Sequence, residues 1–189
     1  MMKWAILAAA LLAPALAFGQ TVNTGQGRLD LSGQAPSGCL ISTPTAAAGA
    51  NSTFQPSGAQ SGQVTITQMV DPNTAVPVAS TINLALPVIC NAAHNVTVST
   101  TNGGLARVGA AAGAPPIGGF RQFLPYQVTA SWAGQTANAT SQAGPTLTIN
   151  SSDGAAGQIS LTIAVPGGGD PMVAGAYNDQ VVIQLQVAS

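Results

Sequence analysis

The chain has 189 residues, of which only four are Lys or Arg and five are Asp or Glu, while 46% are hydrophobic. So few cations cannot neutralise many phosphates, which argues against nucleic acid and against an anionic membrane surface as partners. Disordered chains combine high charge with low hydrophobicity, and this chain has neither property. We therefore expect one folded domain whose polar surface is built from Ser, Thr, Asn and Gln.

Residues 1–19 have the pattern of an export signal. Lys3 supplies a positive charge, residues 4–12 are apolar, Pro14 ends that run, and Ala17 closes a small-x-small cleavage motif. A membrane anchor is the alternative, but the apolar run is shorter than the roughly 20 residues that span a bilayer. We predict a signal peptide that is cleaved after Ala17 or Gly19. The exported chain keeps three Arg and five Asp, a net charge of −2.

Residues 20–37 form an arm that is rich in Gly and Gln and has no hydrophobic core of its own. In an extended conformation its side chains alternate between two faces. One of these faces carries the less polar residues, namely Leu29, Leu31, Gly33 and Ala35. The pattern predicts a strand, either in the domain's own sheet or donated to another molecule. A loose terminus is the third possibility.

The sequence contains two cysteines, Cys39 and Cys90. In an oxidising compartment two cysteines most simply form one bridge. Closing a loop of this length stabilises the fold by about 4 kcal/mol in the chain-entropy model. We predict a Cys39–Cys90 disulfide that ties a short first strand, including Leu40 and Ile41, to the end of a long one. Two unrelated buried thiols are the alternative.

Residues 38–189 alternate apolar and polar side chains in several runs, and helix periodicity is absent. Period-two alternation indicates strands with one buried face. The longer apolar stripes are Ile82 to Cys90, Tyr126 to Trp132, Ile159 to Val165 and Val181 to Val187, and shorter ones include Val64 with Ile66, Val96 with Val98 and Leu147 with Ile149. Because each stripe buries only one face, two sheets must pack together. The predicted fold class is an all-β antiparallel sandwich in one domain over residues 38–189.

Two segments between these runs are expected to lack regular structure. Residues 103–119 are rich in Gly and Ala and low in large side chains, which predicts a mobile or loosely structured insertion. Residues 43–62 are also loop-like, with room for one short strand.

The residues that enzymes use are nearly missing. His94 is the single histidine, there is no Glu, and no Gly-x-Ser-x-Gly motif surrounds a serine. A zinc site at His94 would need the cysteines that the disulfide takes. We expect His94 to cap a turn at the start of a strand, and we expect no catalysis, cofactor or metal. Tyr126 and Trp132 share one strand face and are expected in the core, with a sugar-binding aromatic platform as the alternative.

The order of these features resembles the spore coat protein U domain family, which includes the subunits of archaic chaperone–usher pili. One likeness is the first cysteine close after a short arm, in residues 38–42. Another is the second cysteine at the end of an apolar strand, and a third is the Gly175, Tyr177 and Asp179 pattern before the last alternating strand. Where that family has an aromatic-Gly-x-Tyr element, this chain has Phe54 nearby. The resemblance implies an immunoglobulin-like, pilin-type sandwich that lacks one strand.

The same resemblance implies a structural subunit of a bacterial surface fibre that supports adhesion or biofilm. In such fibres a periplasmic chaperone fills the open groove, and the arm of the next subunit replaces it at an outer-membrane usher. The donor-strand residues would then be Leu29, Leu31, Gly33 and Ala35, and the acceptor groove would be bordered by Val181, Ile183, Leu185 and Val187. The protein would pass through the periplasm to the cell surface. A complete exported sandwich that binds glycans or acts as a tip adhesin is the alternative, and a secreted hydrolase is a third, weaker class.

Overall fold

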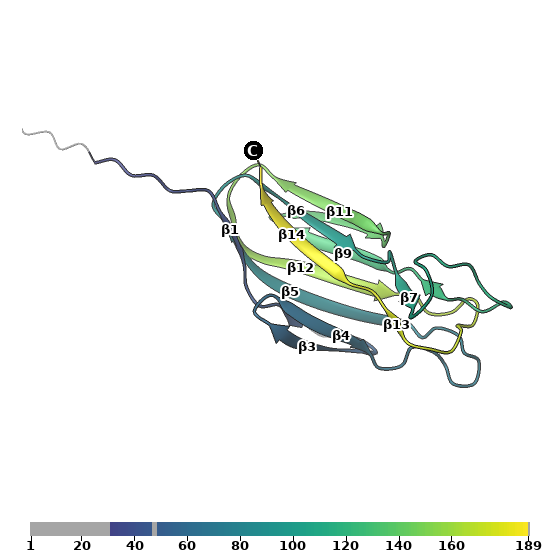
Figure 1. Ribbon diagram of the computed structural model, residues 1–189. Helices are drawn as coiled ribbons and strands as arrows, with labels where there is room; N and C mark the ends of the chain where they lie inside the picture. The colour runs from purple at the N-terminus through teal and green to yellow at the C-terminus, as the bar shows by residue number, and fades with distance from the viewer. Residues whose placement is uncertain (1–30, 47–48, 189) are drawn as a thin grey trace, which may run out of the picture. The chain divides into compact units, whose positions relative to one another are not determined.

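The computed structural model describes residues 31–46 and 49–188, and its elements are strands (Figure 1). The predicted signal peptide and Leu29 lie outside these residues. Backbone contacts divide the chain into a leading unit, residues 1–35, and a main unit, residues 36–189. No helix in the described part is long and apolar enough to cross a bilayer. The protein is an all-β antiparallel sandwich with one disulfide, which confirms the predicted fold class.

The larger sheet has the strand order β1-β5-β12-β9-β10. Its strands are β1 (Cys39–Ile41), β5 (Ser80–Cys90), β12 (Ala155–Val165), β9 (Gln127–Trp132) and β10 (Gln135–Thr140), and β2 (Thr45–Ala46) also pairs with β5. The ladder between β5 and β12 is the longest, from Cys90 opposite Ala155 to Ser80 opposite Val165. These two strands therefore form the centre of the sheet.

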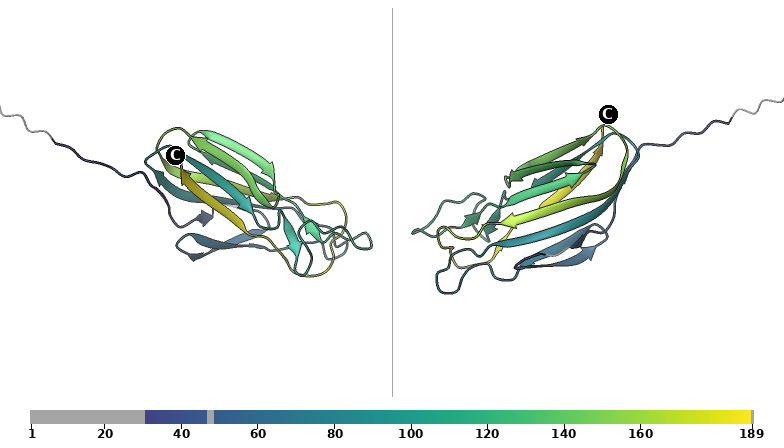
Figure 2. Two further views of the ribbon diagram at one scale, coloured as in Figure 1. Left: turned by 45° about the horizontal axis from the view of Figure 1, so that its top comes forward. Right: turned by 180° about the vertical axis from the view of Figure 1, so that it is seen from behind.

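The second sheet has the order β11-β6-β14 and packs face to face on the larger one (Figures 1 and 2). Its strands are β11 (Gly144–Ser151), β6 (His94–Thr100) and β14 (Val181–Val187). A small sheet of β13 (Tyr177–Asn178), β7 (Leu105–Arg107) and β8 (Phe123–Leu124) lies at one end. A hairpin of β3 (Ser52–Gly58) and β4 (Ser61–Ile66) lies along β5.

The core fills the space between the two sheets and is built from the predicted stripes. The inward residues of β5 are all buried, whereas Ile89, on the opposite face, is 60% exposed. The same alternation buries residues of β6, β9, β11 and β12, among them Val96, Val98, Val128, Trp132, Leu147, Ile149, Ile159 and Leu161. Because a buried aliphatic side chain stabilises a fold by about 1.5–3 kcal/mol, these stripes hold the two sheets together.

The predicted disulfide is present. Cys39 and Cys90 are opposite residues of β1 and β5, and their bond joins positions 51 residues apart in the chain. As predicted, the bridge ties the short first strand to the end of a long one.

Both segments that were expected to be loops contain strands. Residues 43–62 hold β2, β3 and the start of β4, and 103–119 hold β7, in which Ala106 is buried. The ring of Phe54 lies so close to Gly62 that a Cβ at that glycine would overlap it. The expectation of a loose insertion is therefore wrong for residues 105–107. Small and polar residues form these strands because neighbouring segments supply their pairing partners, which a local pattern does not show.

Candidate functional site

A groove of about 880 Å³ runs along β14. Its floor is the inner face of β5 and β12, which contributes Ile82, Leu84, Leu86, Leu161, Ile163 and Val165. One wall is β14, through Val181 to Ile183, and another is the β3–β4 hairpin, through Phe54 and residues 60–66. Figure 1 shows these two walls on either side of β5 and β12. The floor residues are nearly buried, apart from the half-buried Ile163, so the groove reaches the margin of the hydrophobic core between two stretches of strand backbone.

The β14 strand forms an open edge of its sheet. In the described part of the chain it pairs with β6 alone. Its stripe, Val181, Ile183, Leu185 and Val187, is only half-buried, whereas Val96 and Val98 of the neighbouring β6 are completely buried. An edge strand presents unpaired N–H and C=O groups that can template another strand. The two features together, a free backbone edge and an incompletely covered apolar stripe, describe a place where one more strand fits.

The groove covers only part of the predicted border. Val181 and Ile183 line it, but its lining ends at Ile183 on β14 and at Ile41 on β1. Leu185 borders a smaller pocket with Asn95, Thr97, Gln184 and Gln186, and Val187 lines neither. The strand β1, which carries Cys39, also contacts β14. On the opposite side of the sandwich, β10 and β11 contact each other and Gln135 donates from Nε2 to the carbonyl of Asn150 at 2.6 Å.

Three of the predicted donor residues lie in the described part of the arm. Leu31 is 87% exposed, Gly33 and Ala35 are exposed as well, and none of the three belongs to a strand. Leu29 lies outside the described residues. Within the described part of the chain, the predicted apolar face of the arm, with Leu31, Gly33 and Ala35, is therefore exposed.

A carboxylate organises one end of the groove, where Asp179 and Tyr126 both line it. Asp179 Oδ1 accepts hydrogen bonds from the backbone amides of Asn102 and Gln180, both at 2.8 Å. Its Oδ2 accepts from the Gly104 amide and the Tyr126 hydroxyl, both at 2.9 Å. One side chain thus joins the start of β14, the turn after β6 and the start of β9.

The environment of Tyr126 keeps its hydroxyl protonated. Burial raises the pKa of this phenol far above its ordinary value, and the charge of Asp179 and the hydrogen bond to it raise the pKa further. A neutral hydroxyl donates to the carboxylate, whereas a phenolate beside it would be repelled. Tyr126 is therefore a structural donor at every physiological pH, and its side chain, only 3% exposed, is not a platform for a ligand.

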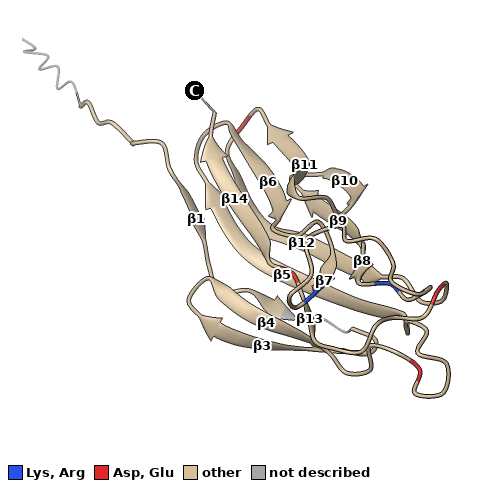
Figure 3. Cartoon of the chain, turned by 45° about the vertical axis from the view of Figure 1, so that its right-hand side comes forward, with Lys and Arg blue, Asp and Glu red and all other residues tan. Residues whose placement is uncertain are grey.

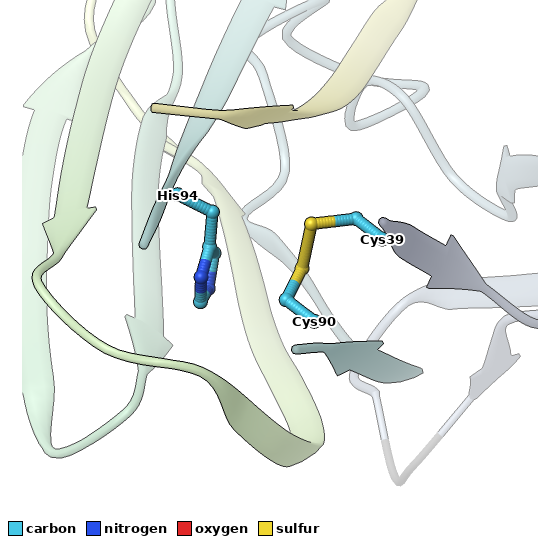
Figure 4. A group of neighbouring side chains, drawn as sticks. All are labelled: Cys39, Cys90 and His94. Atoms are coloured by element: carbon cyan, nitrogen blue, oxygen red, sulfur yellow. A yellow bond between two sulfur atoms is a disulfide. The ribbon is translucent and has the colours of Figure 1, made fainter. Parts of the chain in front are cut away.

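A second buried cluster lies at the disulfide end. Cys39, Cys90 and His94 lie together, as Figure 4 shows. His94 opens β6, its Nδ1 lies 2.8 Å from the carbonyl of Ala92, and its Nε2 accepts from the indole N–H of Trp132 at 2.7 Å. These partners require the neutral ring with its proton on Nδ1. Both sulfurs are in the bridge and both ring nitrogens are hydrogen-bonded, so the cluster is a structural joint and not a set of free metal ligands.

Among the residues that the structure describes, charged side chains lie in turns and short elements (Figure 3). The long strands β5, β6, β9, β10, β11, β12 and β14 carry none. Among the described residues that line the groove, Asp179 is the one charged group, and hydrogen bonds occupy both of its oxygens. The described lining of the groove is therefore apolar and neutral-polar apart from Asp179.

Sequence reasoning missed two parts of this site. The alternation of Val64 and Ile66 predicted part of β4, but the pairing of this strand with β3 was missed, and the signal for β3 was Phe54, a large aromatic residue in a segment expected to be loop-like. The role of Asp179 depends on residues 102, 104 and 126, which are far from it in sequence. The resemblance noted from the sequence singled out Asp179 but did not indicate which groups its carboxylate binds.

Comparisons of this chain with models of protein families, with curated proteins and with solved structures find no match. The assignment of a function therefore depends on the groove, the β14 edge and the arm.

Proposed function

We propose that this protein is a structural subunit of a bacterial surface fibre, and that its copies join by strand donation. The observation that carries the proposal is the groove of about 880 Å³ with an apolar floor beside the unpaired edge of β14. An incomplete sandwich of this kind is costly in water and favours the addition of a strand. The resemblance to the spore coat protein U domain family supports the same function.

The arm has the length of β14 and an alternating pattern. Residues 29–35 span about 23 Å when extended, as does β14 with its 7 residues, and Val181 to Ile183 of β14 border the groove. In a strand paired with β14, alternate side chains would point to the floor. Leu29 and Leu31 would fill the wider part, while Gly33 and Ala35 would fit narrower places. Backbone pairing would supply much of the affinity, and the alternate side chains would set the register.

Donor and acceptor are different surfaces of the subunit, so the contact is heterologous. A heterologous contact that does not close into a ring propagates as a filament. Before assembly, the open groove would require a temporary occupant. We propose a periplasmic chaperone for that role and an outer-membrane usher for the exchange, with export directed by residues 1–19.

A binding module, such as a tip adhesin or a glycan-binding domain, is less well supported. Its aromatic platform would need Trp132 or Tyr126 at a surface, and each of them is 3% exposed. A hydrolase is also less well supported, because the ring nitrogens of His94 are both hydrogen-bonded inside the fold.

Two matched substitutions in the arm test the proposal. Leu31→Asp places a charge on the face that would enter the groove, and Ser32→Asp places the same charge on the opposite face. Both residues are exposed, so neither change disturbs the fold. Losing one buried leucine weakens binding by roughly 10- to 100-fold. Polymer growth is measured by light scattering, and only Leu31→Asp is expected to reduce it. Equal growth of the two variants would contradict strand donation by this face.

A further inference from the structure

Asn91 holds the three residues that precede Cys39. The backbone amide of Gly38 donates to Asn91 Oδ1 at 2.7 Å, and Asn91 Nδ2 donates to the carbonyl of Pro36 at 2.8 Å. The backbone amide of Asn91 donates to the carbonyl of Gly38 at 3.2 Å. One residue thus makes three hydrogen bonds to residues 36–38 and extends the pairing of β1 with β5 past the disulfide.

The chemistry of this position requires an asparagine. Its side chain must accept from Gly38 and donate to Pro36 at the same time, and a carboxamide has one group of each kind. Aspartate has no donor for the Pro36 carbonyl, and alanine has neither group. The adjacent Cys39–Cys90 bridge, with a Cα–Cα distance of 4.2 Å, fixes the next pair of residues. The chain is therefore anchored from Cys39 back to Pro36.

Pro36 is also a natural end for this anchored segment. It lacks an N–H and has a restricted φ, so it cannot continue a ladder and is itself stiff. The predicted donor residues end at Ala35, directly before it. No flexible linker separates the donor strand from the anchored root, whereas a linker of even a few Gly or Ser residues would allow many orientations.

Building on the proposed function, we propose that Asn91 is a positioning residue that fixes the direction in which the arm leaves its domain. A donor strand embedded in a neighbouring copy then transmits that direction to the fibre. Asn91 sets the angle between successive copies, and the groove sets whether they bind.

The test compares Asn91→Ala with the wild-type protein and with Asn138→Ala, a control at an exposed asparagine of β10. The first measurement is backbone ¹⁵N relaxation of the exported chain at low concentration. Rigid backbone has order parameters of about 0.85 and flexible backbone falls below about 0.6. In the wild type and the control, Ser37 and Gly38 are expected at the rigid value. In Asn91→Ala the order parameters of both residues are expected to fall to the flexible range. In Asn91→Asp they are expected to lie between the wild-type and Asn91→Ala values, because aspartate still accepts the hydrogen bond from Gly38.

The second measurement is the distribution of angles between successive copies in electron micrographs of the polymers. Asn91→Ala is expected to broaden this distribution at least twofold while a synthetic arm peptide binds its groove as tightly as that of the wild type. A merely structural role would lower the unfolding temperature and leave the angles unchanged, and that result would overturn the proposal. Rigid Ser37 and Gly38 in Asn91→Ala would overturn it as well. If no copy binds the arm peptide, the proposed function itself fails, which is a separate outcome.

Discussion

Replacing Asp179 by asparagine removes the charge that organises one end of the groove and keeps the size of the side chain. The carboxylate accepts four hydrogen bonds, from the amides of Asn102, Gly104 and Gln180 and from the hydroxyl of Tyr126. Asparagine retains one acceptor oxygen, and its NH₂ group would face the Gly104 amide, which is also a donor. The substitution therefore leaves a buried amide without an acceptor and weakens the bonds that remain.

The expected cost follows from these contacts. A buried donor without a partner costs about 1–3 kcal/mol, and a hydrogen bond to a neutral acceptor is about 1 kcal/mol weaker than one to a charged acceptor. With two such weakened bonds at the remaining oxygen, we expect Asp179→Asn to lower the free energy of unfolding by about 3–5 kcal/mol. That is a large part of the total stability of a typical domain, which is about 5–15 kcal/mol.

Urea unfolding measures this loss. Trp132 is the one tryptophan that follows the predicted signal, so its fluorescence reports on the sandwich. The matched control is Asp153→Asn, because Asp153 is exposed in a turn and its side chain accepts from Ser152. We expect the control to change stability by less than about 0.5 kcal/mol. If Asp179→Asn is as stable as the control, the carboxylate does not organise this region and the reasoning is refuted.

Three further variants, one of them a double substitution, probe the same fold. Replacing both Cys39 and Cys90 by alanine removes a cross-link between residues 51 apart and should cost about 4 kcal/mol, seen as a lower urea midpoint. His94→Ala leaves the buried N–H of Trp132 without an acceptor and should cost about 2–4 kcal/mol; an unchanged midpoint would mean that this bond contributes nothing. Because the pKa of Tyr126 is raised in the folded state, this phenol loses its proton at a lower pH in the unfolded state than in the folded state. The free energy of unfolding should therefore fall as pH rises above about 10, by up to about 1.4 kcal/mol per pH unit. Tyr126→Phe should have a shallower decline, and an identical pH profile would contradict the assignment.

Much of the sandwich could be predicted because strand faces depend on local alternation. The stripes of β5 and β12 are readable in the sequence and are buried as expected. The disulfide was predictable because a chain with a predicted export signal and two cysteines has one simple pairing.

The groove could not be derived in the same way. The stripe of β14, from Val181 to Val187, has the same pattern as a core strand, and only its pairing partners show that one edge is open. The hairpin wall combines Phe54, Val64 and Ile66 with small polar residues, and the pairing of its two strands could not be read from a local pattern. The Asn91 contacts to Pro36 and Gly38 join positions more than 50 residues apart, so no local motif announces them.

Amide hydrogen exchange along β14 tests the central claim most directly. The outward amides of residues 181–187 should exchange rapidly in the isolated chain and become protected, by 100-fold or more, when a peptide of residues 28–36 is added or when polymers form. The amides that pair with β6 should be protected throughout and serve as the internal reference. Protection of every β14 amide in the isolated chain, or no change on assembly, would show a sandwich that is complete by itself and would contradict strand donation.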